Sequence, residues 1–431
     1  MLYRTLSAPI SVQIELTTKC SNNCPHCYNY QRQDDDPDTT MSIDELRVVF
    51  DALGKAKVFS ATITGGEPLL QPDLIVEAVK LCKDSDIACS INTNLTTISE
   101  ELILRMKEAG PFAVLTSLAS HEESTHDAMM GRQGAFTRTI DGIELLKRHS
   151  IRFSANMVVT QMNAHQVYET GAFVHKLGAR SFSATKASPP VGCKDYSSVQ
   201  PTHDQIQTSL DNLLKLTDDT GMPVSVLECY PHCFLKDMSK YAKFAQHKCS
   251  AGITASAIGP DGQVRPCSHS NRTYGSIFTE DLTAIYARMT EWRTGELLPE
   301  KCLTCAYFAA CSGGCRCEAE YAGSISGMDP YATDPSRVAQ LSPLAQTGID
   351  ISPKTRVLVN PHVRFRDEDF GCVLWKNNSV VMVDQGAGAL LRRLQETEMT
   401  LAEATAVSGS DAEQIFTVLK GLVSKKMVSF T

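Results

Sequence analysis

Residues 15–30 read ELTTKCSNNCPHCYNY. Cys20, Cys24 and Cys27 follow a CxxxCxxC spacing, just after the apolar run VQIEL at 12–16. Structural zinc sites use four ligands in a closed tetrahedron. Three thiolates on a [4Fe–4S] cluster instead leave one iron open to a substrate or cofactor. The stretch therefore predicts a metal centre with an open position at the end of a first strand.

Strand and helix patterns alternate outward from this loop, up to about residue 225. Each short apolar run is followed by a segment with helical spacing, and the segment at 42–57 opens with a capping box, Ser42 and Glu45. Six such units predict a parallel sheet with helices outside. Six is short of the eight that close a TIM barrel, so we predict an α/β fold with a partial (β/α)6 TIM-type barrel and chemistry at the carboxyl ends of its strands. The six runs begin at residues 12, 59, 88, 113, 153 and 181.

Three domains are expected: 1–225, 226–345 and 346–431. The second has weak periodicity and is rich in Cys, Gly and Pro, so a metal would supply its core. It ends in a Pro- and Ser-rich linker. The third reads as strands with an Asn377–Asn378 hairpin turn and then helices, a small winged-helix-like β/α domain.

Composition narrows the function classes. The 431-residue chain has a net charge of −8 and no long basic run, which disfavours nucleic acid and anionic membranes as partners. It shows no signal-peptide pattern and no apolar run of spanning length, so a cytoplasmic protein is expected. Sixteen cysteines are many for that compartment, where clustered cysteines indicate metal binding or catalysis.

The motif CSNNCPHC, in this strand–loop context, resembles the signature of radical S-adenosylmethionine (SAM) enzymes. The resemblance implies that the open iron chelates the amino and carboxylate groups of SAM. One electron from the reduced cluster then cleaves the sulfonium, and the resulting 5′-deoxyadenosyl radical abstracts a hydrogen atom.

Further stretches resemble the family's SAM contacts. TGGEP at 64–68 is similar to the motif that binds the methionine amino group, and INTNL at 91–95 to the ribose motif. Many members have an arginine where this chain has Met130, with Arg132 two residues later. Each contact taken singly is equally consistent with an ordinary turn or loop polar group. The residues that the resemblance implies as SAM contacts are His26, Gly65, Gly66, Glu67, Asn94, Ser117 and Asn156.

A second group of cysteines resembles the SPASM extension of this family, which binds two auxiliary iron–sulfur clusters; a zinc ribbon is the alternative. By this resemblance, and by the similarity of GGCRC at 313–317 to the SPASM enzyme of pyrroloquinoline-quinone synthesis, one cluster takes Cys249, Cys267, Cys315 and Cys317. The other takes Cys302, Cys305 and Cys311. Its fourth ligand stays open: absent, or one of Asp329, Asp334, Cys229, Cys233 and Cys372.

The last 70 or so residues resemble a RiPP recognition element, the family in which a leader peptide adds a strand to a sheet edge. A winged helix for DNA or dimer contacts is the alternative. The combined resemblance implies a radical SAM/SPASM maturase that forms a thioether or carbon–carbon crosslink in a ribosomally made precursor peptide. An electron donor such as flavodoxin or ferredoxin is implied. A sulfatase-type formylglycine maturase, a peptide epimerase and a non-catalytic zinc-stabilised peptide-binding scaffold are the alternatives.

Overall fold

The computed structural model describes residues 3–32, 38–235, 237–333, 352–408 and 412–430. The chain divides into two compact units, Met1–Ser342 and Pro343–Thr431, which we describe separately. The predicted boundary between residues 225 and 226 lies inside the first unit and stays a prediction. Among the described residues, no helix is long and apolar enough to cross a membrane.

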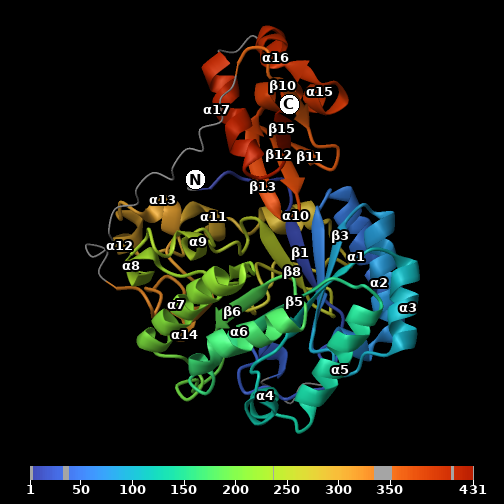
Figure 1. The fold of residues 1–431 in the computed structure, drawn as a ribbon, viewed down its shortest axis with the longest axis vertical. Coiled ribbons are helices and arrows are strands. Elements are labelled where there is room, and N and C mark those ends of the chain that lie inside the picture. Colours follow the sequence, from blue (N-terminus) through green and yellow to red (C-terminus); the bar gives the residue numbers. More distant parts are fainter. Residues whose placement is uncertain (1–2, 33–37, 236, 334–351, 409–411, 431) are drawn as a thin grey trace. The chain divides into compact units, whose positions relative to one another are not determined.

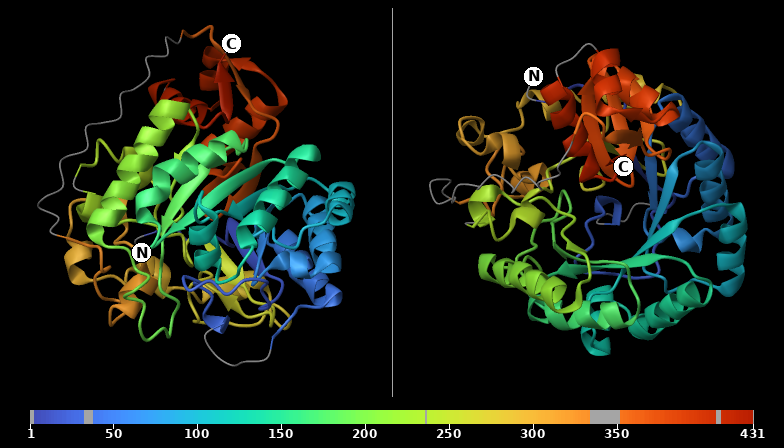
Figure 2. Two further views of the ribbon diagram at one scale, coloured as in Figure 1. Left: turned by 60° about the horizontal axis from the view of Figure 1, so that its bottom comes forward. Right: turned by 45° about the horizontal axis from the view of Figure 1, so that its top comes forward.

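A nine-stranded sheet organises the described part of the first unit, in the order β7-β6-β5-β4-β3-β2-β1-β8-β9. Strands β1 to β8 pair in parallel, and only the β8–β9 pair is antiparallel. The six predicted strands and their parallel pairing are confirmed. The order is linear and the strands curve, as the right panel of Figure 2 shows. The strands are β1 Ser11–Glu15, β2 Ser60–Thr64, β3 Ala88–Thr93, β4 Ala113–Ser117, β5 Phe153–Val159, β6 Phe182–Lys186, β7 Val224–Ser225, β8 Ala255–Ile258 and β9 Val264–Arg265.

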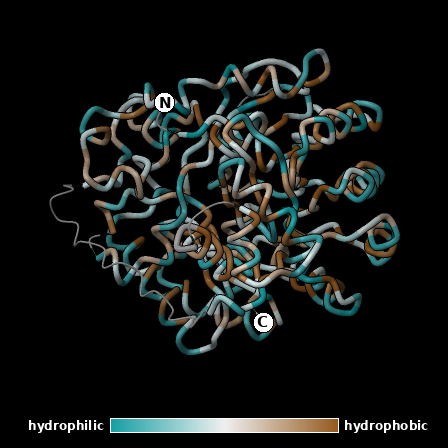
Figure 3. The backbone as a smooth tube through the Cα atoms, turned by 90° about the horizontal axis from the view of Figure 1, so that it is seen from above, coloured by the Kyte–Doolittle hydropathy of each residue, from teal (hydrophilic) through white to brown (hydrophobic). Residues whose placement is uncertain are grey.

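Helices cover the convex side of this sheet (Figures 1 and 2). The capping box predicted at Ser42 and Glu45 is present, with both reciprocal hydrogen bonds. These helices carry apolar and polar residues at helical spacing, and their tubes alternate between brown and teal in Figure 3. The helices are α1 Ile43–Lys55, α2 Pro72–Asp84, α3 Glu100–Ala109, α4 Glu123–Met130, α5 Ala135–Arg148, α6 Val167–Lys176 and α7 His203–Thr220, with 3-10 turns at Tyr30–Arg32, Pro68–Leu70 and Ala164–Gln166.

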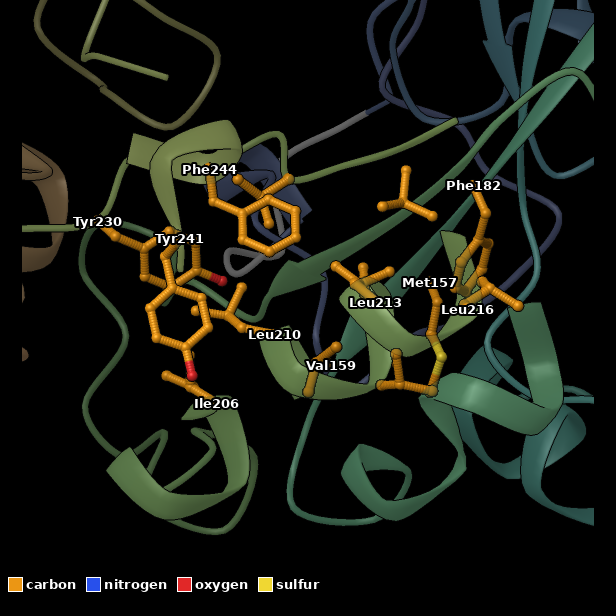
Figure 4. Close-up of a cluster of buried hydrophobic side chains, with 14 of the residues drawn as sticks. Met157, Val159, Phe182, Ile206, Leu210, Leu213, Leu216, Tyr230, Tyr241 and Phe244 are labelled. Atoms are coloured by element: carbon orange, nitrogen blue, oxygen red, sulfur yellow. The ribbon is translucent and has the colours of Figure 1, made fainter. Parts of the chain in front are cut away.

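The apolar core of the barrel continues into the cysteine-rich segment. Met157 and Phe182 from the sheet and Leu213 from α7 share one buried cluster with Tyr230 and Phe244 (Figure 4). Beyond β7 the helices are short, as the low apolar content of this segment predicts. They are α8 His232–Leu235, α9 Ala242–Ala245, α10 Leu282–Ala287, α11 Glu291–Thr294, α12 Glu300–Leu303, α13 Phe308–Cys311 and α14 Arg316–Tyr321.

Two buried ion pairs also join the barrel to this segment. Glu15 at the end of β1 accepts a hydrogen bond from Arg265 of β9, whose guanidinium lies over the Tyr30 ring. Lys186 at the end of β6 pairs with Glu318 of α14, 132 residues away. All four charged side chains are at most 2% exposed.

The second unit has two three-stranded sheets and three helices among its described residues. Strands β11, β12 and β13 form an antiparallel meander. The predicted hairpin turn is confirmed: Asn377 and Asn378 connect β12 to β13 with φ of 48° and 64°. The elements are β10 Arg356–Val359, β11 Arg364–Glu368, β12 Gly371–Lys376, β13 Ser379–Asp384, α15 Gln385–Glu396, β14 Met399–Thr400, α16 Leu401–Ser408, α17 Ala412–Val423 and β15 Val428–Phe430.

Candidate functional site

A cavity of about 280 Å³ lies in the first unit, at the carboxyl ends of the parallel strands. Its wall includes residues that follow β1, β2 and β3 and residues within β4 and β5, because the carboxyl ends of parallel strands meet at one side of a sheet. All ten residues predicted for the SAM site line it: Cys20, Cys24, His26, Cys27, Gly65, Gly66, Glu67, Asn94, Ser117 and Asn156.

Two backbone hydrogen bonds hold the start of the cysteine loop. Gly66 N donates to Thr17 O and Glu67 N donates to Lys19 O, both at 2.7 Å. The approach is close: a Cβ on Gly66 would lie 2.0 Å from Lys19 O. Glycine at this position therefore lets the loop that carries Cys20 lie directly against the end of β2.

Glu67, which follows β2, forms hydrogen bonds with residues at the end of β3. Its carboxylate accepts hydrogen bonds from Leu69 N at 3.0 Å, Thr93 Oγ1 at 2.6 Å and Asn94 N at 2.8 Å. The side chain is 1% exposed. Burial raises the pKa of Glu67 to about 7, and the three hydrogen bonds oppose that shift. These bonds hold the β3 loop, and with it Asn94, at the cavity wall.

Polar contacts join the cysteine loop to the end of β3. Asn94 Nδ2 donates to Ser21 Oγ at 3.0 Å and lies 3.9 Å from Cys20 Sγ. Asn156 of β5 accepts from Thr185 Oγ1 at 2.7 Å. Side chains from the loops after β1 and β3 and from strands β5 and β6 thus form one polar wall.

Helix α4 holds the other side of the loop. Met130 contacts Cys24, with the two sulfurs 3.7 Å apart, and Met130 O accepts from Asn23 N at 3.0 Å. Gly131 follows in the left-handed conformation, where a Cβ would lie 2.0 Å from Asn23 O. Arg132, the nearest arginine to the family position, donates to Ser21 O and does not line the cavity. The thioether of Met130 therefore faces the cavity in its place.

His26 offers an unused nitrogen at this wall. The residue is buried, and no described protein atom hydrogen-bonds its Nδ1. Burial, with a smaller contribution from His126, lowers the pKa of His26 to about 4, so the ring is neutral near pH 7. A buried nitrogen without a protein partner fits a ligand that brings its own polar group.

Five buried or half-buried cysteines gather beyond the cavity, and we call them the first thiol set: Cys229, Cys249, Cys267, Cys315 and Cys317. The four predicted for one auxiliary cluster are together, with Cys267 and Cys317 sulfurs 3.8 Å apart. Cys229 joins them through thiol contacts with Cys249 and Cys315. The set thus holds one thiol more than a [4Fe–4S] cluster takes.

Cys302, Cys305 and Cys311 line a separate, smaller cavity, and Cys233 lines it too. We call these four the second thiol set. Among the open candidates for the fourth position, Asp329 accepts backbone hydrogen bonds from Cys315 N and Tyr331 N instead. Cys372 is buried in the core of the second unit, and Asp334 lies outside the described residues.

Sequence reasoning missed the groups between the main cavity and the first thiol set. Lys186, Ser188 and Glu228 line the cavity. Possible ligand atoms of Glu228, Cys315 and Glu318 lie within 4.8 Å of one another. Burial alone would lower the pKa of Lys186, but nearby negative charges, above all Glu318, raise it well above the usual value, so Lys186 is a cation. No sequence motif predicts that these side chains lie close together, because they are far apart in the sequence.

Three thiols that line one cavity at the carboxyl ends of a parallel sheet are the donor set of an iron–sulfur cluster with one open iron. Residues 14–174 match the family "Radical SAM superfamily". These residues form a radical SAM domain, and the chain is an enzyme. The thiol donors and the partnerless His26 nitrogen fit the cofactors of such a domain, SAM and a [4Fe–4S] cluster.

Three curated relatives and one solved structure illustrate the similarity. An AdoMet-dependent heme synthase of Methanosarcina barkeri is 26% identical over 343 residues, covering 75% of this chain and 96% of that protein. The mycofactocin maturase MftC of Mycolicibacterium smegmatis is 26% identical, covering 77% and 84%. A PqqA peptide cyclase of Bradyrhizobium diazoefficiens is 24% identical, covering 80% and 89%. The structure of Streptococcus suis SuiB bound to its precursor peptide SuiA shares the fold, with a TM-score of 0.60 and 19% identity, over 75% of each chain.

Proposed function

We propose that this enzyme modifies a ribosomally made precursor peptide by hydrogen abstraction, forming a thioether or carbon–carbon crosslink. The observation that carries the proposal is that Glu228, in the wall of the main cavity, lies within 4.8 Å of Cys315 in the first thiol set. Relatives named maturase and peptide cyclase support a peptide substrate.

In this proposal Cys20, Cys24 and Cys27 hold the SAM cluster through three thiolates. When bound, the reduced cluster and SAM supply one-electron hydrogen-atom abstraction. The chain orients SAM: Gly65 and Gly66 let the backbone approach it, and Asn94, Ser117 and Asn156 offer polar groups to its ribose and carboxylate. His26 offers its ring and free nitrogen near the adenine. Glu67 holds the motif in place and would lie beside the methionine amino group.

The auxiliary clusters have an electronic role in this proposal. Forming a crosslink removes two hydrogens from the peptide: one leaves as the abstracted hydrogen atom, and the other must leave as an electron and a proton. Glu228 lies in the wall of the main cavity, and its carboxylate is within 4.8 Å of the Cys315 thiol, which makes a cluster at the first thiol set the nearer acceptor. Flavodoxin or ferredoxin would supply the initial reducing electron. These electron transfers involve no membrane and no nucleic acid.

The second unit is proposed to bind the leader of the precursor. Strands β11 and β13 are the two edges of the meander, and an exposed edge pairs readily with an added strand. At the end of β13, a hollow of about 80 Å³ lies between α15 and α17, with Leu390, Ile415 and Val418 in its wall. The edge would give backbone affinity, and the hollow would select an apolar side chain of the leader.

A second candidate is the synthesis of heme from a precursor. It is favoured by the heme synthase of M. barkeri, 96% of which is covered by the match. The two candidates differ in substrate and not in cofactors, so one experiment separates them.

The experiment uses the full chain, purified and reconstituted with iron and sulfide under nitrogen. Short open reading frames beside the gene supply candidate precursor peptides, which are incubated with enzyme, SAM and reductant. The proposal predicts a peptide that has lost two hydrogens in mass, with fragment ions that skip the linked residues. SAM cleavage without any peptide change, together with conversion of a heme precursor, would refute it.

A further inference from the structure

We infer that Cys233 supplies the fourth thiolate to a cluster held by Cys302, Cys305 and Cys311. The inference rests on the proposed auxiliary clusters and not on the identity of the substrate. The CxxC…C arrangement of Cys302, Cys305 and Cys311 provides only three ligands, and Cys233 would be the fourth.

The four thiols of the second thiol set share one enclosure. All four line the same cavity, together with Met328 and Phe308, in a mostly apolar wall. Four thiols around an apolar hollow are the donor set of a [4Fe–4S] cluster or a tetrahedral zinc ion.

Backbone N–H groups donate hydrogen bonds to the sulfurs of Cys233 and Cys311. Thr333 N donates to Cys233 Sγ at 3.2 Å, and His232 N donates to Cys311 Sγ at 3.3 Å. His232 is itself fixed, because its Nε2 lies 3.0 Å from Ala245 O. Hydrogen bonds from N–H groups stabilise thiolates and tune the clusters that they bind. Cys233, on α8, is therefore oriented by the same short segment that contacts Cys311.

The rival fourth ligands are engaged elsewhere. The Cys229 thiol contacts Cys249 and Cys315 of the first thiol set. The Asp329 carboxylate accepts from Cys315 N at 2.8 Å and from Tyr331 N at 2.9 Å, and it does not line the second cavity. Cys372 packs beside Gly388 in the core of the other unit. Cys233 is the candidate that the geometry selects among the described residues.

The test counts iron in the full chain after anaerobic reconstitution. Three [4Fe–4S] clusters give about twelve iron atoms per chain. We expect Cys233→Ala to lose about four of them, or to lose about one and show the EPR signal of an oxidised [3Fe–4S] cluster. Cys372→Ala, a change at another buried cysteine, should keep the wild-type count and spectra. Cys233→Ser should keep iron through an oxygen ligand but shift one reduction potential.

A triple variant with alanine at Cys302, Cys305 and Cys311 separates the possible failures. If it keeps the full iron count, the second auxiliary cluster itself is refuted. If it loses about four irons while Cys233→Ala keeps all twelve or so with unchanged spectra, only the assignment of Cys233 is overturned. Zinc in place of iron in the wild-type chain would retain the four-thiol site and refute the cluster. If Cys233→Ala misfolds by circular dichroism, Cys233→Ser decides: an unchanged potential overturns the assignment.

Discussion

The close approach of Gly66 to the cysteine loop predicts the effect of Gly66→Ala. The added Cβ would lie 2.0 Å from Lys19 O, whereas unstrained carbon–oxygen contact needs about 3.4 Å, so the loop must move by more than about 1 Å. That movement breaks the bonds from Gly66 N to Thr17 O and from Glu67 N to Lys19 O, each worth about 1 kcal/mol. With residual strain of about 1–2 kcal/mol, the first unit should lose about 3 kcal/mol of stability.

Two assays separate this steric effect from a loss of SAM contact. Urea unfolding of the metal-free protein, followed by circular dichroism, should show the destabilisation, since a residue that only touches SAM would leave it unchanged. SAM cleavage to 5′-deoxyadenosine under dithionite should fall by about 100-fold or more. Gly54→Ala is the matched control: its Cβ would meet only Ser85 Oγ at 3.9 Å, and alanine favours the helix. Wild-type stability in metal-free Gly66→Ala would refute the reasoning.

Three further predictions follow from the site and the fold. Alanine at Cys20, Cys24 and Cys27 together should abolish 5′-deoxyadenosine formation, measured by chromatography, while iron at both thiol sets remains; continued SAM cleavage would refute the assignment. Deleting residues 343–431 should weaken binding of a fluorescent leader peptide but spare uncoupled SAM cleavage and iron content, and unchanged leader affinity would refute the role of the second unit. Burial lowers the pKa of His126 to about 4, below its unfolded value, so its stabilising contribution is present above pH 6.5 and is lost as the pH falls through about 4. His126→Asn, whose side-chain oxygen can still accept from Ala119 N, should remove up to about 3 kcal/mol of that pH dependence in urea unfolding at pH 7 and pH 4.5; an unchanged dependence would contradict this.

The barrel was predictable because the local sequence patterns of its strands and helices all indicate the same fold. Buried parallel strands read as continuous apolar runs, and the capping box at Ser42 marks a helix start by chemistry that acts over three residues. The strands β7, β8 and β9 were not predicted, since two of them have only two residues and their pairing depends on distant partners. Helix α4 was also missed as a helix, although its sequence was noticed for its resemblance to the family.

Only the parts of the site that belong to recognisable sequence motifs could be predicted. Every predicted SAM contact lines one cavity, because each lies within or just after a strand of the same parallel sheet. The distribution of the remaining cysteines was not predictable: Cys229 and Cys233 are four positions apart in the sequence but belong to different thiol sets. The partnership of Lys186 with Glu318 has no local signal at all.

The buried ion pairs between the barrel and the cysteine-rich segment have a consequence for expression. A fragment that ends near residue 225 would keep Lys186 and Glu15 at the ends of β6 and β1 but would lack Glu318 and Arg265, their counter-charges. Removing one partner of a buried ion pair costs about 3–5 kcal/mol where the other charge stays buried, and two such losses together approach the whole stability of an ordinary domain. The predicted barrel, residues 1–225, should therefore not be stable as an autonomous module. Chimeras that transplant it should carry the chain through residue 333, where the described part of the cysteine-rich segment ends.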